Sequence, residues 1–336
     1  MADAAIVITT INAPTRAVVE FARSGPQRGF DVILIGDEKS PRDFRQAGAR
    51  YLDIAAQRDS GLEYARIAPA RHYARKNVGY LEAIRAGAKV IVETDDDNIP
   101  MEAFWEPRQP NVRARLLRDC GWVNIYRYFS DELIWPRGLP LDQVRQIPPP
   151  LPRSPEPSVY CPIQQGLANE NPDVDAIYRL VLPLPVSFRQ MEPVALGAGT
   201  WCPFNSQNTT TFSEAFPLLY LPYYCSFRMT DIWRSLVAQR IAHAYDWSIL
   251  FHSATVFQER NEHDLMRDFE DEVPGYLHND KIRTALDSLD LSAGPDQLPE
   301  AMRICYRRLV EMSLIGEHEL VLLNAWLADL KGAPLT

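Results

Sequence analysis

Three consecutive carboxylates, Asp95, Asp96 and Asp97, end the stretch that begins with the apolar run at residues 90–92. A strand places residues i and i+2 on the same side, so Asp95 and Asp97 point one way and Asp96 the other. Two like charges roughly 7 Å apart repel by about 2 kcal/mol at an effective dielectric near 20, and a cation between them reverses that cost. Carboxylate oxygens suit Mg²⁺ or Mn²⁺. The pattern therefore predicts a metal site, and the alternative is a solvated acidic turn.

The elements around this triplet predict where it lies in a fold. Residues 75–88 form an amphipathic helix pattern, residues 89–97 a buried strand, and Asn98 and Pro100 end that strand sharply. Further strands are expected at residues 5–11, 31–38 and, more weakly, 50–54, with a helix at 16–23. Strands that alternate with helices indicate an α/β class with a doubly wound, mostly parallel sheet. Such sheets bind ligands at the carboxyl ends of their strands, where the triplet is expected.

Charge and composition exclude some classes of protein. The 336 residues carry a net charge of −9, which argues against a nucleic acid as the main partner. The first residues do not resemble a signal peptide, and no apolar stretch is long enough to suggest a membrane span. Five scattered cysteines favour reduced thiols over a disulfide framework, so we expect a cytoplasmic location.

The second half of the chain mixes regular and irregular patterns. We expect a strand at residues 122–129, a proline-rich surface loop at 148–162, a helix at 228–245 and a strand at 247–257. From about residue 261 the pattern is helical. The predicted organisation is a nucleotide-sugar-binding domain over residues 1–260 followed by a helical region over 261–336. Neither the dinucleotide nor the P-loop fingerprint is present.

The order of these pieces resembles a GT-A glycosyltransferase, in which an acidic strand end holds a divalent cation against the diphosphate of a nucleotide sugar. The segments WPRGLPL, NPDVDAIYRL, CPFNSQNTTTF and RMTDIWRSLVAQR are similar to signature segments of the STELLO family of GT-A glycosyltransferase-like proteins. A more distant resemblance extends to the reversibly glycosylated polypeptides, which are UDP-arabinopyranose mutases. The resemblance implies a GT-A fold, a nucleoside diphosphate sugar as donor (a UDP-sugar is favoured), and Mn²⁺ or Mg²⁺ as cofactor.

The resemblance also implies roles for individual residues. Asp97, Asp95 and His252 are the expected metal ligands, with Asp95 also within reach of the ribose; Asp96 is a second candidate for nucleotide binding or a structural residue. Asp231 is expected to act as general base or to orient a sugar hydroxyl, although it could be only a helix cap. In the mutases a reactive arginine carries the sugar covalently, and Arg137 occupies the matching position here. The remaining candidates for nucleotide or sugar binding are Thr10, Asn12, Arg75, Lys76, Asn77, Asp173, Asp175, Trp201, Asn205 and Gln207.

These expectations leave three functions open. The first is glycosyl transfer from a nucleotide sugar to an acceptor, and the second is a pyranose–furanose mutase with Arg137 at the sugar. The third is a binding or scaffold protein that keeps the fold and has lost activity. The acidic triplet together with Asp231 and His252 favours an enzyme over a scaffold, because a scaffold has no need of buried carboxylates.

Overall fold

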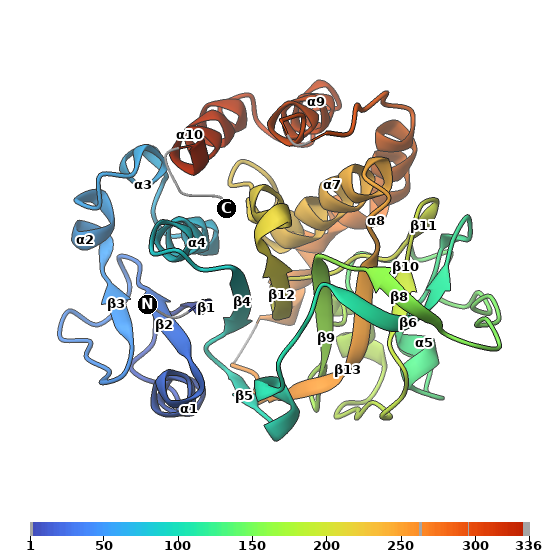
Figure 1. Ribbon diagram of the computed structural model, residues 1–336, viewed down its shortest axis with the longest axis horizontal. Coiled ribbons are helices and arrows are strands. Elements are labelled where there is room, and N and C mark those ends of the chain that lie inside the picture. Colours follow the sequence, from blue (N-terminus) through green and yellow to red (C-terminus); the bar gives the residue numbers. More distant parts are fainter. Residues whose placement is uncertain (1–2, 262–263, 295, 332–336) are drawn as a thin grey trace.

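The computed structural model describes residues 3–261, 264–294 and 296–331, which form a mixed α/β fold around a large sheet (Figure 1). The strands are β1 (Ala4–Thr9), β2 (Phe30–Ile35), β3 (Arg50–Leu52), β4 (Val90–Asp95), β5 (Asn98–Pro100), β6 (Asn111–Leu117), β7 (Gly121–Trp122), β8 (Glu156–Tyr160), β9 (Ile163–Asn169), β10 (Val194–Leu196), β11 (Thr200–Trp201), β12 (Asn208–Phe212) and β13 (Ile249–Gln258). The α-helices are α1 (Arg16–Ser24), α2 (Ile54–Arg58), α3 (Glu63–Ile67), α4 (Lys76–Arg85), α5 (Tyr126–Phe129), α6 (Ala176–Val181), α7 (Thr230–Ala244), α8 (Leu265–Asp287), α9 (Leu298–Glu311) and α10 (Glu319–Lys331). Short 3₁₀ turns include η2 (Tyr73–Arg75) and η5 (Phe227–Met229).

The main sheet has the strand order β3-β2-β1-β4-β12-β9-β13-β10-β6-β8, and β5 pairs with β13 beside this path. Its first four strands are parallel, as the sequence predicts, and their register places Thr9 beside Asp95. Beyond β4 the pairing is mixed, since β12 runs antiparallel to both β4 and β9 while β9 and β13 are parallel. Only the N-terminal part of the sheet is uniformly parallel, whereas the rest contains both parallel and antiparallel pairs.

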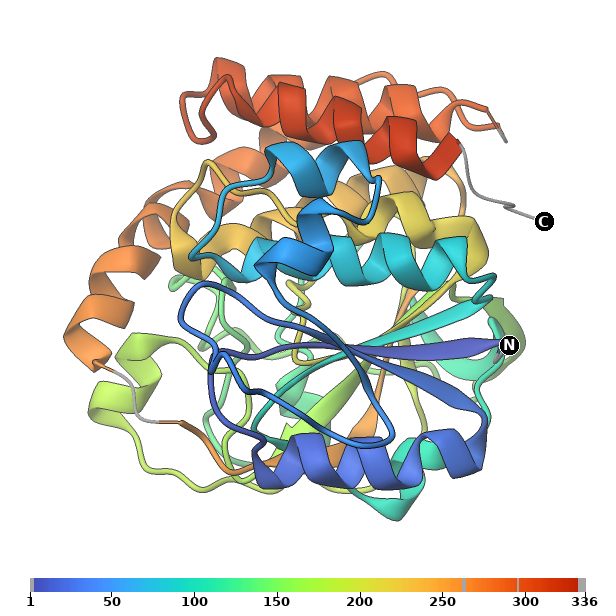
Figure 2. The same ribbon diagram turned by 90° about the vertical axis from the view of Figure 1, so that its left-hand side faces the viewer.

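Helices cover both faces of the sheet, as Figure 2 shows, with α1 on one face and α4 and α7 on the other. Side chains of β1 alternate between the two layers: Ile6 and Ile8 pack with Phe21 of α1, and Val7 packs with Val78 of α4. This alternation follows from the two-residue period of a strand. The parallel strands are therefore buried on both faces, in agreement with their continuous apolar runs.

The C-terminal helices extend the α4 and α7 layer. In Figure 2, α9 and α10 form an outer layer over α4 and α7, and α8 packs on α6 and α7. Trp326 of α10 is fully buried in the same apolar core as Val78 and Leu236. The helical character of residues after 261 is confirmed for the described part of this region, whereas the division into two domains stays a prediction.

Two local predictions are wrong. Residues 122–129 do not form a strand: β7 ends at Trp122 and α5 begins at Tyr126, because Ile125 and Phe129 are buried at helical spacing. The proline-rich segment 148–162 contains a strand, β8, which pairs with β6 at the edge of the sheet. An edge strand tolerates a proline because one side of its backbone forms no ladder hydrogen bonds.

No helix within the described residues is long and apolar enough to cross a membrane. All five cysteines are free thiols.

Candidate active site

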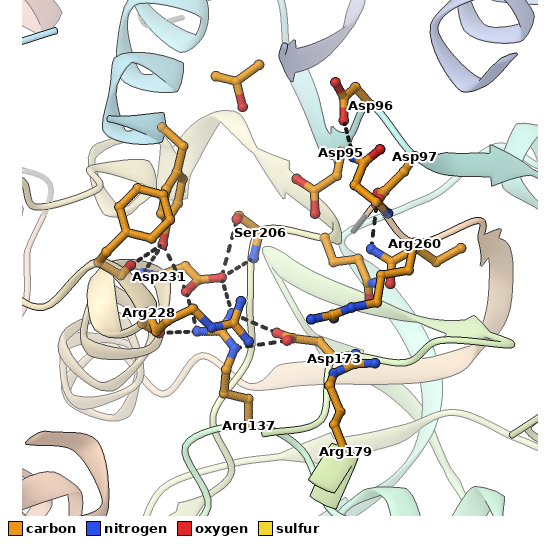
Figure 3. A pocket seen from close by; sticks show the side chains of 16 residues that line it. Asp95, Asp96, Asp97, Arg137, Asp173, Arg179, Ser206, Arg228, Asp231 and Arg260 are labelled. Atoms are coloured by element: carbon orange, nitrogen blue, oxygen red, sulfur yellow. Dashed lines mark hydrogen bonds and ion pairs between the residues drawn. The ribbon is translucent and has the colours of Figure 1, made fainter. Parts of the chain in front are cut away.

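A cavity of about 270 Å³ opens where several strands and loops meet at one edge of the sheet (Figure 3). The carboxyl end of β4 supplies the acidic triplet, and the segment just before β12 supplies Ser206 and Gln207. The end of β13 and the loop after β9 complete the walls. The lining residues are Thr9, Tyr73, Asp95, Asp96, Asp97, Arg137, Asp173, Arg179, Ser206, Gln207, Phe227, Arg228, Asp231, Gln258, Arg260 and Asn261.

Asp96, the middle carboxylate, ties together three segments of the chain. Thr10 Oγ1 donates to its Oδ2 at 2.6 Å, Asn12 Nδ2 donates to the same oxygen at 3.0 Å, and Asn261 Nδ2 donates to Oδ1 at 3.2 Å. Thr15 Oγ1 also donates to the backbone carbonyl of Asp96. Burial raises the pKa of Asp96, and the hydrogen bonds from Thr10 and Asn12 oppose that rise. Thr10 and Asn12 therefore use their side chains to fix the first loop beside the cavity.

Asp97 is held in place and still faces the cavity. Gln258 Nε2 donates to its Oδ1 at 3.0 Å, and the backbone N–H of Asn261 donates to its Oδ2 at 3.1 Å. A carboxylate oxygen has a second lone pair, so these two bonds orient Asp97 without exhausting it as a ligand.

Asp95 lies beside a buried ammonium group. Lys76 Nζ is fully buried and donates to Asp95 Oδ1 at 3.1 Å, to the Thr94 carbonyl at 3.0 Å and to the Ser206 carbonyl at 3.3 Å. The Asp95 side chain is 37% exposed toward the cavity. Its low-dielectric surroundings raise the pKa of Asp95 to about 7; Lys76 opposes the rise, and the charge of Asp97 adds to it. Lys76 therefore lies at the acidic strand end, and its predicted diphosphate role stays a prediction.

The acidic triplet offers two carboxylates to a divalent cation, Asp95 and Asp97. Within the described part of the chain, no group of three or more His, Cys, Asp or Glu side chains is arranged to hold a metal. Mg²⁺ typically takes only one or two carboxylates from the protein and fills its shell with water and phosphate oxygens. Asp95 and Asp97 both line the cavity and offer such a pair.

Opposite the triplet, Arg137 bridges Asp173 and Asp231 (Figure 3). Its Nε and Nη2 donate to the two oxygens of Asp173 at 2.9 and 2.8 Å, and its Nη1 and Nη2 donate to the two oxygens of Asp231 at 3.0 and 2.9 Å. All three residues are buried. Ser206 N–H also donates to Asp231 at 3.1 Å, and Tyr73 Oη donates to it at 3.2 Å. The sequence singled out the three charged residues, and the structure shows them as one network.

This network changes the roles expected for Arg137 and Asp231. Burial alone would destabilise the charge of Arg137, but Asp173 and Asp231 outweigh it and hold the pKa of the guanidinium well above its usual range. A nucleophilic arginine needs a free, unprotonated nitrogen, so the geometry argues against a covalent sugar carrier. Burial likewise opposes the charge of Asp231, yet Arg137 holds the pKa of that carboxyl well below its usual range. Asp231 is thus a poor general base and positions Arg137, Ser206 and Tyr73 instead. It is also no helix cap, because Met229 occupies that position.

Like Thr10, Asn12, Lys76 and His252, five further predicted site residues have internal partners and do not line the cavity. Arg75 is buried and donates to Gln57 and to the Ala68 carbonyl. The structure therefore corrects the predicted diphosphate role of Arg75 and of Asn77, which lie at the start of α4. The other four are Asn77, which bonds Tyr64 and Leu221; Asp175, the N-cap of α6, which also accepts from Trp135; Trp201, which packs on His243; and Asn205, which accepts from the Gln207 N–H.

His252 lies far from the triplet, which corrects its assignment as a metal ligand. β13 bulges after His252, so that His252 pairs with Gly166 and Phe257 with Asn169, and His252 lies about 10 Å before the end of β13 that supports Asp97. His252 Nδ1 lies 3.0 Å from the Ser253 carbonyl. Burial, and then the charge of Arg108, lowers its pKa to about 3. His252 is a neutral core histidine.

Several lining residues were not predicted. Tyr73 and Ser206 contact Asp231, and Gln258 supports Asp97. Arg260 and Asn261 directly follow β13, and their position at the carboxyl end of an expected strand was an available signal. Arg179 and Arg228 lie inside the motifs NPDVDAIYRL and RMTDIWRSLVAQR, but a single arginine on a helix is more often a solvated side chain.

Comparisons with known proteins give the following matches. Residues 228–335 match the family model described as STELLO glycosyltransferases. Two proteins of Arabidopsis thaliana, "Probable glycosyltransferase STELLO1" and "Probable glycosyltransferase STELLO2", are 30% and 31% identical over 264 residues. Each alignment covers 70% of this chain and 33% of the relative, so the chain spans about a third of the length of these curated relatives.

Two solved structures are similar to the chain in fold. One is a mycobacterial protein, with a TM-score of 0.42, covering 84% of this chain and 74% of its own. The other is the glucosyl-3-phosphoglycerate synthase of M. tuberculosis, with a TM-score of 0.41, covering 83% of this chain and 80% of its own. Both are 11% identical to it. Among all these matches, the two sequence comparisons confirm that the chain is related to the STELLO glycosyltransferases, the family that its sequence motifs resemble.

Proposed function

We propose that this chain is a glycosyltransferase of the GT-A type that uses a nucleoside diphosphate sugar, a UDP-sugar, together with Mn²⁺ or Mg²⁺. One observation carries the proposal. Asp95 and Asp97, at the carboxyl end of a parallel strand, line the same cavity as the Arg137–Asp173–Asp231 network. A diphosphate site and a set of polar groups able to hold sugar hydroxyls therefore face one another. The names of the curated relatives support the same activity.

The residues of the chain have distinct tasks in this proposal. Asp95 and Asp97 hold the divalent cation, which when bound neutralises the charge of the departing diphosphate. Lys76 keeps Asp95 turned toward the cavity through its hydrogen bond and its charge. Thr10 and Asn12, fixed by Asp96, shape the first loop where the nucleoside is expected.

On the opposite wall, Asp231 positions hydrogen-bond donors for the sugar. It orders the Ser206 hydroxyl and the Tyr73 hydroxyl, both of which line the cavity. Groups held in this way act without reorganisation when the sugar–phosphate bond breaks. The saturated guanidinium of Arg137 disfavours the mutase alternative, which needs a reactive atom at the sugar.

The test is thermal unfolding with and without UDP and Mn²⁺. At one hundred times the dissociation constant a ligand stabilises the folded state by about 2.7 kcal/mol. For a chain of 336 residues this raises the melting temperature by about 4 °C. UDP should give this shift only with Mn²⁺, EDTA should abolish it, and Asp97→Ala should lose it. Asp131→Ala, at an exposed pair with Arg189, is the control and should keep the full shift. An equal shift in Asp97→Ala would contradict the metal assignment.

A cytoplasmic location and a sugar acceptor complete the proposal. The free cysteines support the first. The need for an acceptor follows from transfer chemistry. When a labelled nucleotide sugar is supplied without an acceptor, the labelled sugar should pass slowly to water. A ring-contracted nucleotide sugar formed under the same conditions would favour the mutase.

A further inference from the structure

Three arginines line one part of the cavity and form a positive wall there. Arg179 comes from α6, Arg228 from η5, and Arg260 from the segment after β13. Figure 3 shows the side chains of Arg179 and Arg260 reaching toward the same part of the cavity, beside Asp173. Two of the three are already paired: Arg260 lies 3.1 Å from Asp268, and Arg228 lies 2.9 Å from Glu272 and 3.8 Å from Asp268.

Arg179 is the member of this wall with the fewest partners. Its Nη2 donates to the Pro172 carbonyl at 2.8 Å, and its Nε is buried without a hydrogen-bond partner. Among the residues that the structure describes, no carboxylate lies within ion-pair distance of Arg179. Burial, and then the charge of Arg260, lowers the pKa of Arg179 to about 9.

The nearest carboxylate in the cavity is already engaged elsewhere. Both oxygens of Asp173 accept hydrogen bonds from Arg137, at 2.9 and 2.8 Å. A guanidinium is a planar fork that binds carboxylate or phosphate oxygens in pairs. Arg179 and Arg260 are partly buried and repel each other, and Arg179 has both an unpartnered N–H and no carboxylate partner, so an added oxyanion would supply what the chain does not offer Arg179.

The wall adjoins the proposed diphosphate site on its Asp173 side. The acidic triplet and Lys76 belong to the N-terminal part of the sheet, at the end of β4. Arg260 comes from the segment whose Gln258 and Asn261 bind Asp97, and it lies between the triplet and Asp173, whereas Arg179 reaches Asp173 from α6 (Figure 3). A transferase cavity must hold two molecules, and the donor already has a place at the strand end.

We propose that Arg179 and Arg260 bind a phosphate or carboxylate group of the acceptor, so that the sugar is transferred to an anionic molecule. This inference rests on the proposed function for the identity of the donor. Arg179 and Arg260 then orient the acceptor, so that its hydroxyl group points past Asp173 toward the donor sugar.

Sulfate is a suitable probe of this subsite, because it is a tetrahedral oxyanion and does not precipitate Mn²⁺. Its binding to the full chain is measured by titration calorimetry with UDP and Mn²⁺ present at saturation, against sodium chloride at equal ionic strength. We expect sulfate to bind together with UDP–Mn²⁺. Arg179→Gln and Arg260→Gln should each weaken sulfate binding at least tenfold while changing UDP–Mn²⁺ affinity less than twofold. Arg113→Gln, at an exposed pair with Glu192, is the matched control and should leave both affinities unchanged.

Four results would overturn the inference. Sulfate affinity that is unchanged in both arginine variants removes the subsite. If UDP–Mn²⁺ displaces sulfate, and Arg179→Gln weakens the affinity for both ligands equally, the arginines belong to the donor diphosphate site. An Arg179-dependent preference for UDP-glucuronate over UDP-glucose assigns them to an acidic donor sugar. If UDP–Mn²⁺ fails to bind the unaltered chain, the donor assignment itself fails, and the acceptor role fails with it. That result is distinct from loss of the sulfate subsite alone.

Discussion

Replacement of Asp231 by asparagine tests how the Arg137 network is held together. The substitution keeps the shape of the side chain and removes its charge. Arg137 would keep its two hydrogen bonds to Asp173 and lose one of its two ionic partners. The new amide group can still accept from the Ser206 N–H through its oxygen, but its NH₂ would face the donors of Arg137 or Tyr73.

The size of the effect follows from the burial of the pair. The side chains of Arg137 and Asp231 are only 6% and 4% exposed. Breaking a buried ion pair by removing one partner costs about 3–5 kcal/mol, and the lower end applies because Asp173 remains. Unfolding entropy of about 2 cal/mol/K per residue gives about 0.7 kcal/mol/K for 336 residues. A loss of about 3 kcal/mol therefore lowers the melting temperature by about 4 °C.

Differential scanning calorimetry at pH 7 measures this shift directly. Asp131→Asn is the matched control, because Asp131 is 86% exposed and also pairs with an arginine, Arg189. The control should move by less than about 1 °C, as exposed pairs contribute little. Since the pKa of Asp231 is held well below its ordinary value, its contribution is complete above the unfolded-state pKa of about 4 and is lost only as the pH falls below that. Equal melting temperatures for the two variants at pH 7 would refute the structural importance of the Arg137–Asp231 pair.

Three further predictions concern other parts of the fold. Glu319 is buried and accepts hydrogen bonds from the Tyr220 hydroxyl and from the N–H groups of Tyr223 and Tyr224. Burial raises the pKa of Glu319 to about 7. Its contribution to the free energy of unfolding should therefore fall by about 3 kcal/mol as the pH rises from 4.5 to 7. Denaturant unfolding should show this fall in the difference between the unaltered chain and Glu319→Gln, and a difference independent of pH would contradict it. Gly79→Ala should destabilise the chain by about 1–3 kcal/mol, because the added Cβ would lie 2.5 Å from Val7 and 2.9 Å from Ile35; an unchanged denaturation midpoint would show that α4 can move away. Tyr73→Phe keeps the ring and removes the hydrogen bond to Asp231, so it should cost about 1 kcal/mol by the same measurement and leave UDP–Mn²⁺ binding unchanged.

The sequence predicts best where local patterns decide the structure. The β-branched run before Asp95 indicates a buried strand, and the triplet lies at its carboxyl end in the structure. The helix at residues 228–245 is also found, as α7, from its apolar spacing. Prediction from local patterns fails at residues 122–129. Aromatic and β-branched residues favour a strand there, but burial of Ile125 and Phe129 selects a helical turn.

The candidate site is less predictable because its contacts link distant residues. Arg137 is 36 residues from Asp173 and 94 from Asp231, and no local pattern indicates that they form one ionic network. His252 shows the opposite case, since it has the right residue type on the right strand but lies at the wrong point along it. Periodicity identifies the strand and the face, whereas position along the strand depends on pairing with distant neighbours.

The pairing of β4 with β12, which comes much later in the chain, has a consequence for folding during synthesis. During synthesis the four parallel strands emerge first, and their edge at β4 stays open until β12 arrives more than a hundred residues later. An unpaired strand edge is a template for pairing with other chains. Asn261, which fixes Asp96 and Asp97, emerges later still. The ribosome-bound chain therefore passes through a long interval in which its N-terminal sheet is formed, its edge is unprotected and its binding cavity does not yet exist, and it is in this interval that we expect it to depend most on chaperones.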